Sequence, residues 1–382
     1  MSLARTALVT GAAGFIGSHV MEVLARRDDL RALGVDRDSR PEDLSQALDE
    51  ADIIFHLAGV NRPESPEEFE TGNAGFMREL CAALDERGRR PLVVLSSSTQ
   101  AALDNPYGIS KRHAEEVLQA WSERSGAPTV VSRLPNVFGK WARPFYNSAV
   151  ATFCHQAARG LELTINDPAA PLSLVYIDEV VEHLLRCLDE PPHGFEFREV
   201  EPVFHTRVGE VAERILSFPR TRETLRVPDF AEPLTLRLYA TYLSHLPPED
   251  FAYRLSTSVD ERGALAEMLK QPGFGQIFVS RTAAGVTRGN HYHHTKCEKF
   301  LVLEGEGVIR FRDVRGGPVT EHRVSGRDFT VLDIPPGFTH SIENVGGGEL
   351  VTLFFANELF DPEHPDTYFL RVLPAEGEDD TP

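Results

Sequence analysis

Two patterns of hydrophobic and polar residues divide the chain. In the first half, continuous apolar runs alternate with segments in which apolar residues recur every three or four positions. Continuous runs predict buried strands of a parallel sheet, and the longer segments predict amphipathic helices. Residues 7–36 fit strand, Gly-rich turn, helix and strand, and further strands are expected at 52–60 and 91–98, with a helix from about 106 to 122. This alternation predicts an α/β Rossmann-type doubly wound parallel sheet.

The pattern changes in the second half, where short apolar runs are separated by Gly-rich turns. Such spacing predicts an antiparallel β-sandwich or barrel. Pro247 and Pro248 would stop a helix, so the boundary between the two domains is expected near 246–256. The domains are predicted at 1–248 and 249–374, followed by an acidic tail at 375–382.

Composition narrows the classes of partner. A length of 382 residues predicts two or three domains. A net charge of -19 argues against nucleic acid or a membrane surface as partner, because phosphates would be repelled. The four cysteines lack the spacing of a metal site or a disulfide framework, which fits a reducing compartment. With neither an apolar signal segment nor a run of 18 apolar residues, we expect a soluble cytoplasmic protein.

A Gly-rich turn between the first strand and helix predicts a dinucleotide site. Gly11, Gly14 and Gly17 would let the backbone approach a pyrophosphate at the helix N-terminus. The alternative is a tight structural turn, which the strand-turn-helix context disfavours. Asp36, at the end of the second strand, would accept from a ribose 2′-hydroxyl and favour NADH, whereas Arg37 would hold the 2′-phosphate of NADPH.

Ser98, at the end of the fourth apolar strand, and Tyr107 and Lys111, in the helix that follows, suggest carbonyl chemistry. Ser98 ends that strand, and Tyr107 and Lys111 are four apart at the start of a helix, so their side chains share one face. A nearby ammonium would favour the phenolate of Tyr107, and Ser98 would hydrogen-bond a substrate carbonyl. A chance amphipathic pair is the alternative for Tyr107 and Lys111.

A histidine cluster in the second half predicts a metal site. His291 and His293 would leave the same face of a strand, Glu298 follows a short polar break, and His340 comes after a Pro-Pro-Gly turn. Imidazole and carboxylate together suit zinc or another divalent transition metal. A solvated histidine-rich strand is the alternative for any one of these histidines.

Residues 1–245 resemble an extended short-chain dehydrogenase/reductase, a family that acts on nucleotide-linked sugars. The likeness rests on TGAAGFIG, HLAG, the Ser98/Tyr107/Lys111 set, RLPNVFG and LVYIDEVV. Tyr107 comes only nine positions after Ser98, so which of Ser96, Ser97 and Ser98 faces the carbonyl is open, and Ser98 is preferred. The resemblance implies further cofactor contacts at Phe15, Ile16, Leu57, Ala58 and Gly59, and substrate contacts at Asn136, Lys140, Arg143 and Asn147.

The second half resembles a cupin. Its first box is met by Gly285, His291, His293, Glu298 and Gly305, and its second by Pro335, Gly337, His340 and Asn344. The whole chain is similar to bifunctional capsular polysaccharide enzymes of the CapF type, which act in making UDP-N-acetyl-L-fucosamine. The resemblance implies that the cupin epimerises C3 of a UDP-linked 4-keto-6-deoxy-N-acetylhexosamine and that the reductase then reduces C4 with NADPH. It also implies a homodimer.

Two questions remain open from sequence. The base for C3 epimerisation is not identified, since Tyr292, His294, Lys296 and Lys299 all lie near the metal box. The alternative function is a single-activity nucleotide-sugar reductase or epimerase whose cupin is a structural or dimerising metal module.

Overall fold

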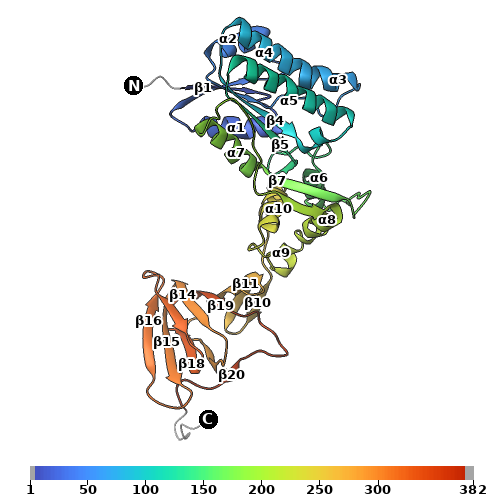
Figure 1. The fold of residues 1–382 in the computed structure, drawn as a ribbon. Helices are drawn as coiled ribbons and strands as arrows, with labels where there is room; N and C mark the ends of the chain where they lie inside the picture. Colours follow the sequence, from blue (N-terminus) through green and yellow to red (C-terminus); the bar gives the residue numbers. More distant parts are fainter. Residues whose placement is uncertain (1–4, 375–382) are drawn as a thin grey trace. The chain divides into compact units, whose positions relative to one another are not determined.

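The computed structural model describes residues 5–374 and divides into two compact units (Figure 1). The first unit comprises the chain up to Leu216 together with Arg237–Leu246, and the second comprises Ser217–Leu236 and the chain from Pro247. The chain crosses for the last time from the first unit to the second between Leu246 and Pro247, two residues before the expected boundary at 248/249. The expected acidic tail lies outside the described residues.

A parallel sheet forms the centre of the first unit. Its six strands have the order β2-β1-β3-β4-β5-β8, and every neighbouring pair is parallel. The strands are β1 Arg5–Thr10, β2 Leu30–Val35, β3 Ile53–His56, β4 Leu92–Ser98, β5 Thr129–Leu134 and β8 Phe195–Phe197. Their apolar runs are continuous because helices bury both faces. The doubly wound α/β sheet is thus confirmed.

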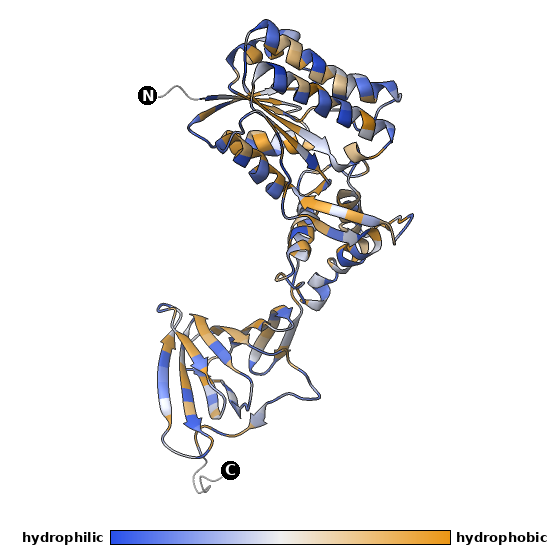
Figure 2. Ribbon diagram, in the orientation of Figure 1, coloured by the Kyte–Doolittle hydropathy of each residue, from blue (hydrophilic) through white to orange (hydrophobic). Residues whose placement is uncertain are grey.

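Two layers of helices cover this sheet. Side chains of α1 (Phe15–Leu24) and α7 (Ile177–Asp189) pack on the face that carries Val9, and those of α2 (Pro41–Glu50), α4 (Phe76–Glu86) and α5 (Pro106–Ser125) pack on the face that carries Leu8. Figure 2 shows the matching alternation of hydrophobic and hydrophilic residues along the helices. None of the helices between residues 5 and 374 is long and apolar enough to cross a membrane.

Residues at each end of α5 explain where the helix begins and ends. Asn105 caps the helix by accepting from the Gly108 N–H at 2.8 Å, and Pro106 occupies the first turn, where its missing N–H costs nothing. The helix ends at Gly126, whose φ of +73° is left-handed. It therefore runs three residues beyond the expected end at 122.

A smaller layer completes the first unit. Its three-stranded sheet has the order β6-β7-β9, with β7 and β9 antiparallel. These strands are β6 Asn136–Phe138, β7 Pro171–Tyr176 and β9 Phe204–Arg207. The remaining helical elements of this unit are α3 Glu67–Glu70, the π-helical turn η1 Thr71–Gly75, η2 Thr99–Ala102, α6 Ala149–Ala157, α8 Val208–Ser217 and most of α10 Pro233–Ser244. Two short ones, α9 Thr221–Thr224 and η3 Pro248–Asp250, belong to the second unit.

Two antiparallel sheets form the second unit, in the orders β10-β11-β12-β19-β14-β17 and β16-β15-β18-β13-β20. Side chains from both sheets, among them Phe300 and Phe354 from one and Ile309 and Ile342 from the other, share one apolar core. The strands are β10 Thr257–Asp260, β11 Gly263–Gln271, β12 Gly275–Thr282, β13 Thr287–Tyr292, β14 Glu298–Glu304, β15 Glu306–Asp313, β16 Thr320–Ser325, β17 Val331–Ile334, β18 Phe338–Asn344, β19 Leu350–Ala356 and β20 Tyr368–Phe369. The all-β architecture is confirmed, and the closed barrel of a cupin stays a prediction.

The segment Ser217–Leu236 is held to β11 by backbone hydrogen bonds. The Lys270 N–H donates to the Leu225 carbonyl at 2.6 Å, and the Val227 N–H donates to the Lys270 carbonyl at 3.0 Å. The Gln271 side chain adds a bond to the Pro228 carbonyl at 3.1 Å. These partners are distant in sequence, so the hydrophobic pattern gave no sign that this segment joins the second unit.

Candidate active site and metal centre

The Gly-rich loop between β1 and α1 has no room for a side chain at two positions. A Cβ on Gly17 would lie 2.0 Å from the Gly11 carbonyl oxygen, and one on Gly11 would lie 2.8 Å from the Ala58 nitrogen. Gly14 precedes α1 without any side-chain capping bond. The first N–H groups of α1 are therefore left for an outside acceptor, which suits a pyrophosphate.

The expected cofactor contacts converge on this loop. Phe15 and Ile16 begin α1, and Leu57 follows β3 with its N–H bonded to the Thr10 carbonyl at 3.2 Å. A Cβ on Gly59 would lie 3.4 Å from the Lys111 Nζ atom, so the β3 end reaches the expected catalytic residues. The residues predicted from the motifs thus lie near one another at the carboxyl ends of the strands, where α/β sheets bind ligands.

Asp36 immediately follows β2 and binds back to the glycine loop. Its two carboxylate oxygens lie 3.0 and 2.9 Å from the Ala13 nitrogen, whose N–H they accept. Its own N–H donates to the Ser39 hydroxyl at 2.9 Å. The carboxylate is therefore fixed beside the expected ribose position, with Arg37 next to it in the chain.

Tyr107 and Lys111 lie in the first turns of α5. The Lys111 side chain is buried, and its Nζ donates to the Ser96 carbonyl at 2.9 Å. Burial lowers the pKa of Lys111 to about 8, and the Glu115 carboxylate opposes this shift. Burial raises the pKa of Tyr107, and the neighbouring Ser98 hydroxyl opposes that shift. Burial thus dominates the pKa of Tyr107, which keeps its proton at neutral pH, and the expected effect of Lys111 on the phenol stays a prediction.

The three consecutive serines have different hydrogen-bond partners. Ser96 donates to the His56 carbonyl at 3.4 Å, and Ser97 donates to the buried Glu115 carboxylate. Ser98 is less buried, and its hydroxyl accepts from the Gln100 N–H at 3.2 Å. Ser98 is therefore the serine whose hydroxyl retains a proton to donate beside Tyr107, which supports the preference for it.

Two buried polar residues escaped the sequence analysis. Asn73, in the π-helical turn, accepts from the Val60 N–H at 3.0 Å and donates to the Ser110 hydroxyl at 2.9 Å, so it ties the β3 end to α5. Glu115 pairs with Arg133 through contacts of 2.6–3.2 Å one turn after Lys111. A π-turn often marks a functional site, but single polar residues in an apolar pattern gave no clear signal.

The expected substrate residues lie on and beside the loop after β6. Lys140 pairs with Asp178 at 2.5 Å, Arg143 lies 5.7 Å from the centre of the Tyr146 ring, and Asn147 is exposed. Asn136 donates to the Ser173 carbonyl at 3.2 Å. Sequence analysis missed Arg62, which lies 5.6 Å from the same Tyr146 ring and donates to the Phe145 carbonyl at 3.0 Å. The loop therefore gathers two guanidinium groups around one aromatic ring.

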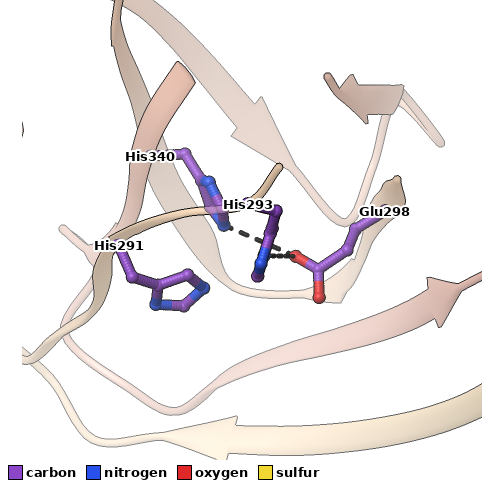
Figure 3. Close-up of side chains that lie close together, drawn as sticks. All are labelled: His291, His293, Glu298 and His340. Atoms are coloured by element: carbon purple, nitrogen blue, oxygen red, sulfur yellow. Dashed lines mark ion pairs between the residues drawn. The ribbon is translucent and has the colours of Figure 1, made fainter. Parts of the chain in front are cut away.

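The four expected metal ligands meet in the second unit (Figure 3). Their nearest ligand atoms all lie within 4.8 Å of one another. His291 on β13 is directly opposite His340 on β18, and Glu298 begins β14. A Glu298 oxygen lies 3.4 Å from the Nε2 atoms of both His293 and His340.

The chemistry of this cluster fits a divalent cation. The Nε2 atoms of His293 and His340 are buried without a hydrogen-bond partner, which is costly unless something else binds them. Burial lowers the pKa of His291 to about 4. For Glu298, burial raises the pKa, but His293 and His340 outweigh it and bring the value to about 2. His291 and Glu298 therefore present unprotonated ligand atoms at neutral pH, and three imidazoles with one carboxylate suit Zn²⁺.

The four residues weighed as epimerisation bases all have other partners. Tyr292 stacks on Tyr368 with ring centres 5.3 Å apart, and His294 packs on the same ring at 4.9 Å. The Lys296 ammonium is buried and donates to the Pro365 carbonyl at 2.7 Å. Lys299 pairs with Asp333. Nearness in sequence to the metal box therefore did not identify a base.

Comparison with known proteins defines the class. Residues 7–200 match the NAD dependent epimerase/dehydratase family, and residues 258–368 match the polysaccharide biosynthesis C-terminal domain. Because the first match covers half of the chain, the protein belongs to the NAD dependent epimerase/dehydratase family.

Individual relatives span nearly the whole chain. It is 45% identical over 365 residues to a UDP-2-acetamido-2,6-beta-L-arabino-hexul-4-ose reductase from Pseudomonas aeruginosa, covering 96% of this chain and 98% of that protein. The crystal structure of the capsular polysaccharide assembling protein CapF from Staphylococcus aureus superposes with a TM-score of 0.89 at 43% identity, covering 96% of this chain and all of that one. A UDP-glucuronic acid 4-epimerase from Bacillus cereus shares the fold of 63% of this chain and 98% of that one, at 18% identity and a TM-score of 0.54.

Replacing Gly17 tests the dinucleotide site. In Gly17→Ala the new methyl group would meet the Gly11 carbonyl and displace the loop, at a cost of about 1–3 kcal/mol. We expect NADPH and NADH to bind roughly tenfold or more weakly by calorimetric titration. The control Gly347→Ala, where a Cβ meets nothing within 4 Å, should bind as the wild type does. Equal affinity in Gly17→Ala would place the dinucleotide elsewhere.

Proposed function

We propose that this chain reduces the C4 ketone of a UDP-2-acetamido-2,6-dideoxy-hexos-4-ulose with NADPH, after its second unit has inverted C3. The product would be UDP-2-acetamido-2,6-dideoxy-L-talose, a precursor for capsular or surface polysaccharide of the UDP-N-acetyl-L-fucosamine pathway. The observation that carries the reductase part is the placement of Tyr107 and Lys111 one turn apart on α5, with Ser98 beside Tyr107 at the end of β4. The names of the two full-length relatives, a hexulose reductase and a capsule assembly protein, support the substrate class.

Residues of this chain would donate the proton and stabilise the negative charge that develops during reduction. A bound nicotinamide supplies the hydride to C4. Ser98 hydrogen-bonds the ketone oxygen and orients it, and Tyr107 donates its proton as the alkoxide forms. Lys111 stabilises the tyrosinate that this leaves, since its ammonium is buried where charge interactions are strong.

The dinucleotide preference depends on two adjacent residues. Arg37 would pair with the 2′-phosphate of NADPH, while the Asp36 carboxylate accepts from the Ala13 N–H and is held against the loop. NADH stays an alternative donor because Asp36 stands where a ribose hydroxyl would bind. Comparing kcat/KM for the two donors decides this point.

The basic loop after β6 would hold the substrate's diphosphate and nucleotide. Lys140, Arg143, Asn136 and Asn147 are the proposed contacts, and Arg62 adds a second guanidinium beside Tyr146. Guanidinium groups suit phosphate oxygens in geometry and charge. Local basic residues thus reconcile a net charge of -19 with an anionic substrate.

The second unit would perform the C3 epimerisation. His291, His293, Glu298 and His340 would hold a divalent metal, with Zn²⁺ proposed. When bound, such an ion stabilises negative charge on a ketone or enolate oxygen as a Lewis acid. The unpartnered Nε2 atoms of His293 and His340 support this assignment. A homodimer and a cytoplasmic location remain predictions.

A second candidate function keeps the reductase and makes the β unit a structural or dimerising metal module. One observation favours it, namely that the ammonium groups of two of the weighed bases, Lys296 and Lys299, are both bonded to other groups. No proton acceptor for C3 has therefore been found among them. Isotope exchange separates the two candidates.

The pH dependence tests the reductase site. Lys111 is cationic below its pKa of about 8 and neutral above it, whereas Tyr107 loses its proton only above the ordinary range for tyrosine. We therefore expect kcat/KM for ketone reduction to fall as pH rises through about 8. Lys111→Met should lower kcat by about 10²–10³-fold and abolish the fall of kcat/KM near pH 8. The control Lys299→Met, on the second unit, should keep the wild-type profile. A profile flat from pH 7 to pH 9 in the wild type would contradict the assignment.

Solvent exchange tests the epimerase site. In ²H₂O without NADPH, the wild type should incorporate deuterium at C3 of the 4-keto substrate, measured by mass spectrometry. His340→Ala or a chelator should slow the exchange by about 10²-fold or more, because the metal would no longer stabilise the enolate. His340→Ala should still reduce an already epimerised ketone.

Two controls sharpen this experiment. His322→Ala removes an exposed histidine outside the cluster and should leave the exchange unchanged. Tyr107→Phe should keep the exchange and lose reduction. Exchange that persists at the wild-type rate in His340→Ala would refute the epimerase site and leave the structural-module function.

A further inference from the structure

The segment around Asp366 is bonded to β13, the strand that carries His291 and leads directly into His293. β20 pairs with β13 so that Phe369 lies opposite His291 and Tyr368 opposite Tyr292. The Leu370 N–H donates to the Asn290 carbonyl at 2.9 Å. The chain just before β20 is therefore fixed next to the turn that follows His293.

The Asp366 carboxylate holds that turn through its backbone. One oxygen accepts from the His294 N–H at 2.9 Å, and the other accepts from the Thr295 and Lys296 N–H groups at 2.9 and 2.8 Å. The Thr295 hydroxyl lies 3.0 Å from the same carboxylate and 3.0 Å from that of Glu358, and its single hydrogen serves one of them at a time. Three consecutive N–H groups on one carboxylate fix the path of the chain between His293 and Glu298.

The Asp366 main chain acts on His293 directly. The His293 Nδ1 atom lies 2.5 Å from the Asp366 carbonyl oxygen. A carbonyl can only accept, so Nδ1 must carry the hydrogen, and in the neutral ring Nε2 then bears the lone pair. That Nε2 is the buried atom without a hydrogen-bond partner, and it faces Glu298 in the cluster (Figure 3).

The backbone of Asp366 is shaped for both tasks. Its φ is +38°, in the left-handed region where aspartate is among the better tolerated residues. The Lys296 ammonium donates to the carbonyl of Pro365, the residue before Asp366, at 2.7 Å and adds a side-chain bond between the turn and this segment. One residue thus presents its carboxylate to the turn and its carbonyl to the imidazole.

We propose that Asp366 is a positioning residue for the metal centre, which sets the tautomer and orientation of His293 and the position of Glu298. The proposal rests on the proposed metal site. Partners of this kind behind ligating histidines raise metal affinity, and their loss weakens it by about 10–100-fold. A residue that only stabilised the local fold would leave the affinity of the folded protein unchanged.

The test compares zinc affinity in the full chain by competition with a chromophoric chelator. Asp366→Asn removes the charge and puts an N–H₂ group against the N–H donors, so we expect zinc to bind about 10–100-fold more weakly. The visible spectrum of bound Co²⁺ should change as well, because the ligand geometry changes. The matched control is Asp361→Asn, which loses a local bond to the Glu363 N–H at 2.9 Å and should bind zinc as the wild type does.

The outcomes separate this proposal from the metal site itself. If Asp366→Asn binds zinc within about twofold of the wild type, the positioning role is wrong and the metal site stands. If the wild type binds no zinc, both are wrong. Should Asp366→Asn not fold, Thr295→Val removes one hydroxyl contact to the carboxylate and leaves the backbone bonds in place. It should weaken zinc binding by a smaller factor, and unchanged affinity would overturn the proposal.

Discussion

The hydrogen bond from the buried Lys111 ammonium to the Ser96 carbonyl is the interaction on which the proposed reductase site depends. A buried ammonium is costly unless it is paired, so this bond ties α5 to β4. It brings Tyr107, one turn earlier, to Ser98 at the end of β4. Glu115, one turn later, pairs with Arg133 of β5 and fixes the same helix to the next strand. The geometry of the catalytic set is thus a consequence of satisfying buried charge.

The proposed metal centre also depends on buried polar groups, but here two of them lack a hydrogen-bond partner within the described residues. There the fold leaves the Nε2 atoms of His293 and His340 without hydrogen-bond partners around the Glu298 carboxylate, and the proposed cation would satisfy them. Strand pairing opposite His340 and the bonds to Asp366 hold the imidazoles in place beforehand. In both sites, backbone carbonyls accept from or hold the functional side chains, Ser96 for Lys111 and Asp366 for His293.

Sequence reasoning succeeded where the chemistry is local in the chain. The glycine spacing, the Tyr107–Lys111 pair and the two histidine boxes each fall within a few residues, so periodicity and turn residues predict them. It failed where partners are distant, as for Asp366, which is 73 residues from His293. Arg62 was missed for the same reason, because its partner loop is 83 residues away. The base for C3 stays unidentified, because nearness in sequence to the metal box does not distinguish among Tyr292, His294, Lys296 and Lys299.

The central claim is that one chain inverts C3 and then reduces C4. The most direct measurement is NMR analysis of the product that the zinc-loaded full chain makes from a UDP-4-keto-6-deoxy-N-acetylhexosamine and NADPH. The account predicts a C4-reduced sugar with inverted configuration at C3. A C4-reduced sugar that keeps its original C3 configuration would contradict it.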